Sequence, residues 1–136
     1  MTQQQKNIGR WILRLVAAVI MLQTLFFKFS AAPESVYIFS ELGMEPWGRI
    51  ATGVLELLAS VLILIPASTS LGALLGAGLM AGAVSFHLTK LGIAVQDDGG
   101  QLFAYALIVL FCCVALLVIY KKQLLQFISK PFKKAI

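Results

Sequence analysis

Charged residues are scarce in this chain of 136 residues. Only 12% of the side chains are Asp, Glu, Lys or Arg, whereas 60% are hydrophobic. Soluble domains carry about 25% charged residues. A chain this short leaves much of its surface exposed after folding, so it could not hide so many apolar side chains from water. The composition therefore excludes an ordinary water-soluble domain and indicates that lipid surrounds most of the chain.

Histidine and cysteine are also rare. The chain has one histidine and two cysteines, Cys112 and Cys113, which are adjacent. Adjacent Cα atoms lie about 3.8 Å apart, whereas a relaxed disulfide needs at least about 4.4 Å. No C-x-x-C pair and no Cys/His metal spacing occurs in the sequence. We therefore expect no metal site and no covalently bound cofactor, and we interpret the cysteines as small apolar packing residues.

Four apolar segments account for most of the sequence. They cover about residues 11–29, 48–65, 71–94 and 101–120. Each is close to the roughly 20 residues that a helix needs to cross the hydrocarbon core, and lipid cannot satisfy the open edge of a strand. The sequence predicts an all-α polytopic membrane protein, with residues 1–136 forming one domain built as a four-transmembrane-helix bundle.

Two further segments have an amphipathic pattern. Residues 33–42 begin with Pro-Glu, a favourable first helical turn, and are too apolar for free solvent, so we expect a short interfacial helix on the outer face. After residue 120, apolar residues alternate with lysines. This basic C-terminal tail suits adhesion to an anionic leaflet, and docking of a partner protein is the alternative.

The net charge of +5 is unevenly placed along the chain. Arg14 opens the first apolar segment, and the basic residues beyond the two ends of the apolar region are Lys6, Arg10, Lys121, Lys122, Lys130, Lys133 and Lys134. The connecting segments carry the acids Glu34, Glu41, Glu45, Asp97 and Asp98. The positive-inside rule therefore predicts that both termini lie in the cytoplasm. We expect a multi-pass protein of the cytoplasmic (inner) membrane. This pattern does not indicate nucleic-acid binding.

Polar residues recur at one depth of the predicted bundle. At about 1.5 Å rise per residue, Gln23, Glu56, His87 and Tyr105 all fall within the outer half of the bilayer, and Lys28 borders this layer. Polar groups inside a bilayer are expensive and mark functional sites. We predict that these five residues form a ligand-binding or proton-linked site, with Glu56 and His87 acting as one unit. Alternatively, Glu56 is a neutral buried acid, His87 is a satisfied core histidine, and Lys28 extends to the interface.

Glycines are spaced for close helix packing in the third apolar segment. Gly72 and Gly76 form one G-x-x-x-G pair, and Gly78 and Gly82 form a second. Small residues at this spacing allow two membrane helices to approach closely. We predict that all four glycines serve helix packing.

The sequence resembles the DoxX-like family in four segments, residues 22–29, 45–50, 53–57 and 80–88. The most specific points are the glutamate that follows a glycine in the second apolar segment and the histidine late in the third. The resemblance implies a four-helix membrane protein. The family takes its name from a small subunit of a thiosulfate:quinone oxidoreductase, and relatives are associated with membrane redox systems.

Three functions are compatible with these features. The first is a membrane subunit or accessory of a quinone-linked redox system, with quinone as a diffusible cofactor and a redox protein as partner. The second is a non-enzymatic membrane anchor or assembly factor. The third is a binder or carrier of another small lipophilic molecule. Catalytic residues are not assigned, and self-association into a homo-oligomer stays open.

Overall fold

The computed structural model describes residues 2–135, with side chains described up to residue 129. Helices make up most of this part of the chain, and it contains no strand. The helices are α1 (Gln3–Phe29), α2 (Pro33–Glu41), α3 (Trp47–Leu64), α4 (Thr69–Phe86), α5 (Gln101–Ile119) and α6 (Lys121–Ala135), with short helical turns η1 (Pro66–Ser68) and η2 (His87–Leu91).

Four helical segments in the described residues are long and apolar enough to cross a membrane. They are Gln3–Phe29, Trp47–Leu64, Pro66–Leu91 and Gln101–Ile119. The prediction of an all-α membrane protein with four spanning helices is confirmed. The short helix expected at residues 33–42 is present as α2, and the basic tail is helical as α6.

Two helix ends differ from the expected ones. α1 begins at Gln3 rather than near residue 11, because Thr2 and Gln5 form a reciprocal capping box with bonds of 3.0 and 3.1 Å. The third span ends at Leu91 rather than residue 94, because Gly92 adopts a φ of +81°, which stops a right-handed helix. Its last turn, η2, is a π-helix that starts at His87.

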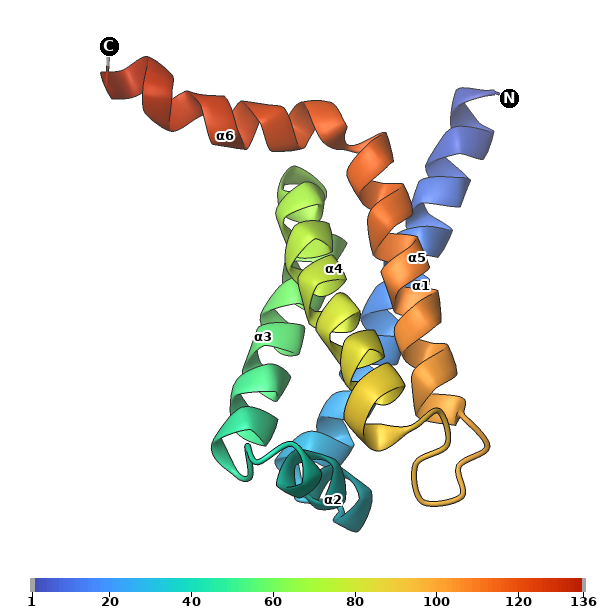
Figure 1. Ribbon diagram of the computed structural model, residues 1–136. Coiled ribbons are helices and arrows are strands. Elements are labelled where there is room, and N and C mark those ends of the chain that lie inside the picture. Colours follow the sequence, from blue (N-terminus) through green and yellow to red (C-terminus); the bar gives the residue numbers. More distant parts are fainter. Residues whose placement is uncertain (1, 136) are drawn as a thin grey trace.

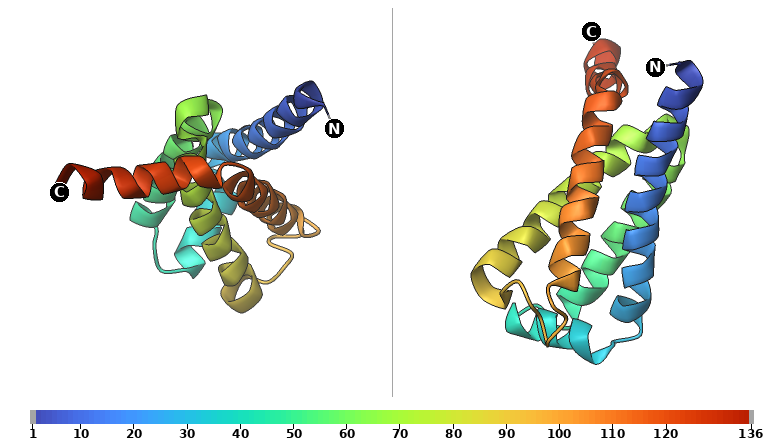
Figure 2. Two further views of the ribbon diagram at one scale, coloured as in Figure 1. Left: turned by 90° about the horizontal axis from the view of Figure 1, so that it is seen from above. Right: turned by 90° about the vertical axis from the view of Figure 1, so that its right-hand side faces the viewer.

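The spanning helices form a ring in which each contacts two neighbours. α1 packs against α3 and α5, and α4 packs against the same two helices. Both chain termini lie at one end of the bundle, and α2 and the 92–100 loop lie at the other (Figures 1 and 2). In Figure 1 and in the right-hand view of Figure 2, α3 and α4 are close near the termini and diverge toward α2.

Two buried arginines hold the antiparallel pair α1 and α3 at its opposite ends. Arg14, only 2% exposed, donates from Nε to the Ile63 carbonyl at 2.8 Å and from Nη2 to the Leu64 carbonyl at 2.6 Å. Arg49 donates to the Lys28 carbonyl at the end of α1. The last carbonyls of a helix lack partners within the helix and carry partial negative charge, so a cation there is favourable. Each helix therefore supplies a cation to the C-terminus of the other.

Gln123 fastens α6 to the turn between α3 and α4. Its Nε2 donates to the Pro66 carbonyl at 2.8 Å, and its Oε1 accepts from the Ser70 backbone N–H at 2.8 Å. These bonds fix the start of α6, which runs across the end of the bundle rather than along it (Figure 1). The expected adhesion of this tail to a leaflet stays a prediction.

The four glycines of α4 divide into two unlike pairs. A Cβ at Gly72 would lie 2.6 Å from the Ile63 backbone nitrogen and 2.7 Å from the Ala59 carbonyl oxygen, and one at Gly76 would lie 2.8 Å from Cys113 Sγ. These two glycines permit close helix contact. A Cβ at Gly78 or Gly82 would meet no atom within 4 Å. Gly78 and Gly82 therefore make no close helix contact within the described residues, because α4 has diverged from α3 at their level, and the packing role expected for them stays a prediction.

Glycine-to-alanine substitutions in α4 should separate the two pairs. Gly72→Ala places a methyl group against the backbone of α3, so we expect a loss of about 1–3 kcal/mol in the free energy of unfolding. Gly82→Ala has room for the methyl group and replaces a poor helix former, so the expected change is between zero and a gain of about 1 kcal/mol. Denaturation of both variants in the same detergent measures the difference, and equal stabilities would contradict the close contact at Gly72.

Candidate functional site

A cavity of about 580 Å³ lies inside the half of the bundle that contains α2 and the 92–100 loop. This volume is within the usual range of small-molecule sites. Much of the wall is apolar, with Met21, Phe27, Phe39, Leu79, Phe86 and Val109 among the contributing residues. The polar lining residues are Gln23, Thr24, Lys28, Glu34, Ser35, Thr52, Glu56, His87, Gln96, Asp97, Asp98, Gln101 and Tyr105.

All five residues singled out in the sequence line this one cavity. Gln23 and Lys28 come from α1, Glu56 from α3, His87 from the start of η2 and Tyr105 from α5. Similar depth and helical phase placed them in one layer, and the ring of helices brings that layer around a common space. Their role in binding or proton transfer stays a prediction.

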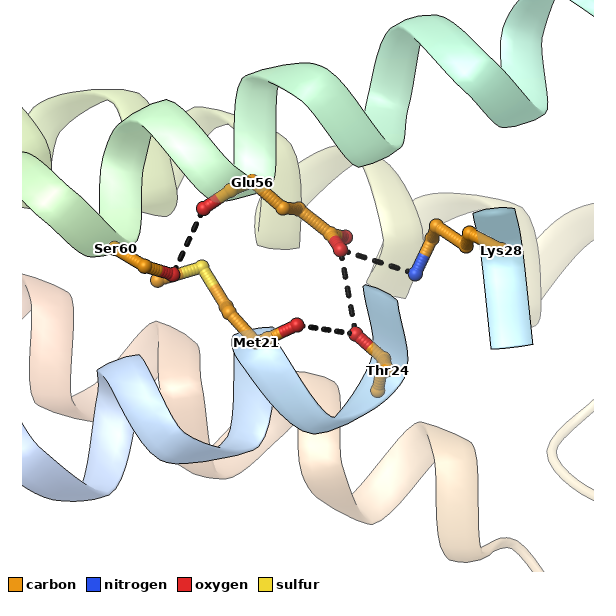
Figure 3. Close-up of polar contacts among 5 residues, drawn as sticks. All are labelled: Met21, Thr24, Lys28, Glu56 and Ser60. Carbon is orange, nitrogen blue, oxygen red and sulfur yellow. Dashed lines mark hydrogen bonds and ion pairs between the residues drawn. The ribbon is translucent and has the colours of Figure 1, made fainter. Parts of the chain in front are cut away.

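Glu56 and Lys28 form the charged contact on the cavity wall. Glu56 is 3% exposed, and its Oε2 lies 3.0 Å from Lys28 Nζ (Figure 3). Lys28 sits in the last turn of α1, so its ammonium also lies near the negative end of that helix. A buried carboxylate without a partner would strongly destabilise the fold, and the ion pair with Lys28 offsets part of that cost. The ion pair therefore joins α1 to α3 between the two arginine contacts.

Thr24 is a weaker partner of Glu56 than Lys28 is. Thr24 Oγ1 lies 2.8 Å from the Met21 carbonyl oxygen and 3.3 Å from Glu56 Oε2 (Figure 3). A hydroxyl has one hydrogen, which favours the shorter bond. Glu56 Oε1 accepts no hydrogen bond from the described residues. One oxygen of the carboxylate is thus held by the protein and the other can accept from a ligand.

His87 is oriented by the turn that ends the third span. Its Nδ1 lies 2.9 Å from the Gly92 carbonyl oxygen, and its ring meets Phe103 edge-on at 5.5 Å between centroids. A carbonyl only accepts, so Nδ1 carries the hydrogen and Nε2 of the neutral ring is an acceptor. The single Glu56–His87 unit expected from the sequence is replaced by two separate contacts, Glu56 with Lys28 and His87 with Gly92, on one cavity.

Asp98 organises the loop that closes this end of the cavity. Its Oδ1 accepts from the backbone N–H of Val95 at 3.0 Å and Gly100 at 2.8 Å, and its Oδ2 accepts from that of Leu102 at 3.2 Å. Burial works against ionisation, but these hydrogen bonds and the nearby His87 hold the pKa of the Asp98 carboxyl below its usual value. The sequence identified Asp98 only as one of the acids of the connecting segments, although an aspartate that accepts from the N–H two residues on is a common turn signal.

Gln23 and Tyr105 occupy less enclosed parts of the lining. Gln23 is exposed, and Tyr105 is half-buried. The Tyr105 hydroxyl oxygen accepts from Gln101 Nε2 at 2.9 Å. Its own hydrogen stays available to donate.

The fold and the site together define a four-helix integral membrane protein with a partly polar cavity inside the bundle. The chain belongs to the DoxX-like family, whose sequence model matches residues 12–116. The matched segment runs through the four spanning helices and includes Lys28, Glu56 and His87, whereas α6 lies beyond it. No curated protein and no solved structure gives a significant match.

Removing the cation of the buried pair should destabilise the bundle. Lys28→Met leaves Glu56 without its main partner, so we expect the free energy of unfolding near neutral pH to fall by about 3 kcal/mol. The double variant Lys28→Met/Glu56→Leu removes both charges and should recover at least half of that loss. Denaturation in matched detergent measures both, and a Lys28→Met protein as stable as wild type would refute the ion pair.

The Asp98 contacts predict a pH-dependent contribution to stability. A folded-state pKa below the unfolded value of about 3.9 means that the stabilisation is present above about pH 4 and is lost as pH falls through the folded value. Asp98→Asn should therefore lower the melting temperature at pH 7, and the gap from wild type should shrink below about pH 4. A gap that stays constant down to acid pH would show that the charge of Asp98 contributes nothing.

Proposed function

We propose that this chain is a small membrane subunit or accessory protein of a quinone-linked redox system, and that its cavity binds the quinone head group. The observation that supports this most directly is the buried Lys28–Glu56 pair on the wall of a largely apolar cavity. Such a combination suits a ligand with a flat apolar ring and a few polar atoms.

The hydrogen-bond donors on the wall match the carbonyl oxygens of a quinone. The Lys28 ammonium has three hydrogens, and one contact with Glu56 leaves others to donate. The Tyr105 hydroxyl is a second donor. The side chains of Phe27, Phe39 and Phe86 supply aromatic faces for the ring.

The acceptors on the wall match the reduced ligand. Reduction of a quinone to a hydroquinone adds two electrons and two protons and converts both carbonyls to hydroxyl groups. A hydroquinone hydroxyl can donate to Glu56 Oε1 or to His87 Nε2. In this proposal the electrons come from a redox partner protein, and the protons pass through ionisable groups of the lining. With both termini cytoplasmic, the cavity lies in the outer half of the membrane.

The non-enzymatic alternative is favoured by one feature of the same pair. Lys28 and Glu56 satisfy each other and join two helices, as expected of a purely structural contact in a membrane anchor or assembly factor. The two functions predict different ligand binding for a variant in which residue 56 keeps the shape of Glu but loses its charge.

Glu56→Gln tests the proposal with a soluble decyl-tailed quinone as the probe. Gln retains the size of Glu and can hydrogen-bond but cannot ionise, so it accepts more weakly from a hydroquinone hydroxyl. The fold should be kept while the Kd for the reduced, hydroquinone form of the probe rises by about tenfold or more. Binding is measured by titration of the detergent-solubilised protein.

Ser85→Ala is the matched control. Ser85 is exposed, its hydroxyl donates to the Ala81 carbonyl of its own helix, and it does not line the cavity. This variant should bind the quinone as wild type does. If Glu56→Gln also binds like wild type, or if wild type binds no quinone, the anchor function is supported instead.

A further inference from the structure

The second glycine pair of α4 lies where the cavity meets the surface of the bundle. Gly78 and Gly82 both line the cavity, and Gly78 is exposed. A side chain at either position would enter open space, since a Cβ there meets no atom within 4 Å. Gly72 and Gly76 each precede one member of this pair by six residues, and a Cβ at either position would strike α3 or α5. The cavity therefore reaches the outside of α4 at Gly78.

The position of Gly78 along the third span determines whether lipid or water surrounds the helix there. The third span runs over Pro66–Leu91, and Gly78 is near its middle. An exposed surface at mid-span of a membrane helix faces acyl chains rather than water. The cavity is thus open to lipid beside Gly78.

The other boundary of the cavity is acidic. Glu34 on α2 and Asp97 and Asp98 in the 92–100 loop line the end away from the chain termini. The charge of Lys28 is already balanced by Glu56. These acids would repel a ligand with net negative charge. Such a ligand would also find Lys28 already paired with Glu56.

We propose that the cavity takes a neutral amphiphile from the bilayer, and that the tail of the ligand passes over Gly78 and Gly82 into the lipid while the head lies beside Lys28 and Glu56. This inference rests on the proposed function and specifies its ligand class. The two glycines keep a passage open, and any larger side chain there narrows it.

Gly78→Leu tests the passage with two probes that share one head group, a decyl-tailed quinone and the same quinone without a tail. The leucine side chain blocks the tail but not the head group, so the Kd for the tailed quinone should rise by about tenfold while that for the tail-less quinone stays within about twofold. Ala81→Leu is the matched control, because Ala81 is exposed on the same helix and does not line the cavity. It should change neither affinity.

The outcomes separate the two proposals. Equal weakening of both quinones by Gly78→Leu, or no weakening, would overturn the passage. If the wild-type protein binds neither quinone, the proposed quinone function is wrong, and the passage is tested separately. In that case a phospholipid with a photoreactive diazirine in its acyl chain still tests the passage in nanodiscs. Crosslinks to Leu79 and Phe86 that Gly78→Leu removes and Ala81→Leu retains would support it, and their absence from wild type would overturn it.

Discussion

Lipid offers no hydrogen bonds, so a charged side chain inside this bundle needs a partner from the protein itself. The α1–α3 contact meets that requirement at three levels. Arg14 binds carbonyls at the end of α3, Lys28 pairs with Glu56, and Arg49 binds a carbonyl at the end of α1. Each contact crosses from one helix to the other, so the buried charges fix both the register and the antiparallel orientation of this pair.

The rest of the bundle is arranged around that fixed pair. α4 approaches α3 closely at Gly72, where a side chain would strike the α3 backbone. Farther along, α4 packs against α5 and diverges from α3 (Figure 1), and residues of α2 and of the 92–100 loop line the cavity at that end. The cavity is therefore a consequence of one close contact at one end of two diverging helices, and Glu56 lies on its wall because the pair with Lys28 holds it there.

Much of this architecture could be predicted from the sequence, because membrane helices follow from length and hydropathy alone. The shared depth of Gln23, Glu56, His87 and Tyr105 was also visible, since rise per residue is constant. Partners were harder to predict. Arg14 binds the Ile63 and Leu64 carbonyls of α3, and backbone acceptors leave no trace in a sequence. The Gly92 carbonyl that binds His87 depends on a backbone turn. Gly78 and Gly82 share the spacing of Gly72 and Gly76, and only the divergence of the helices separates their roles.

In the proposed function, Lys28 donates to a quinone carbonyl inside the cavity, and infrared difference spectroscopy tests this hydrogen bond most directly. A quinone labelled with ¹³C at its carbonyl groups is bound to wild type and to Lys28→Met in nanodiscs, and the isotope-sensitive carbonyl bands are compared. A hydrogen bond from an ammonium group weakens the C=O bond, so the account predicts a band at lower frequency in wild type than in the variant. Identical carbonyl bands in the two proteins would contradict it.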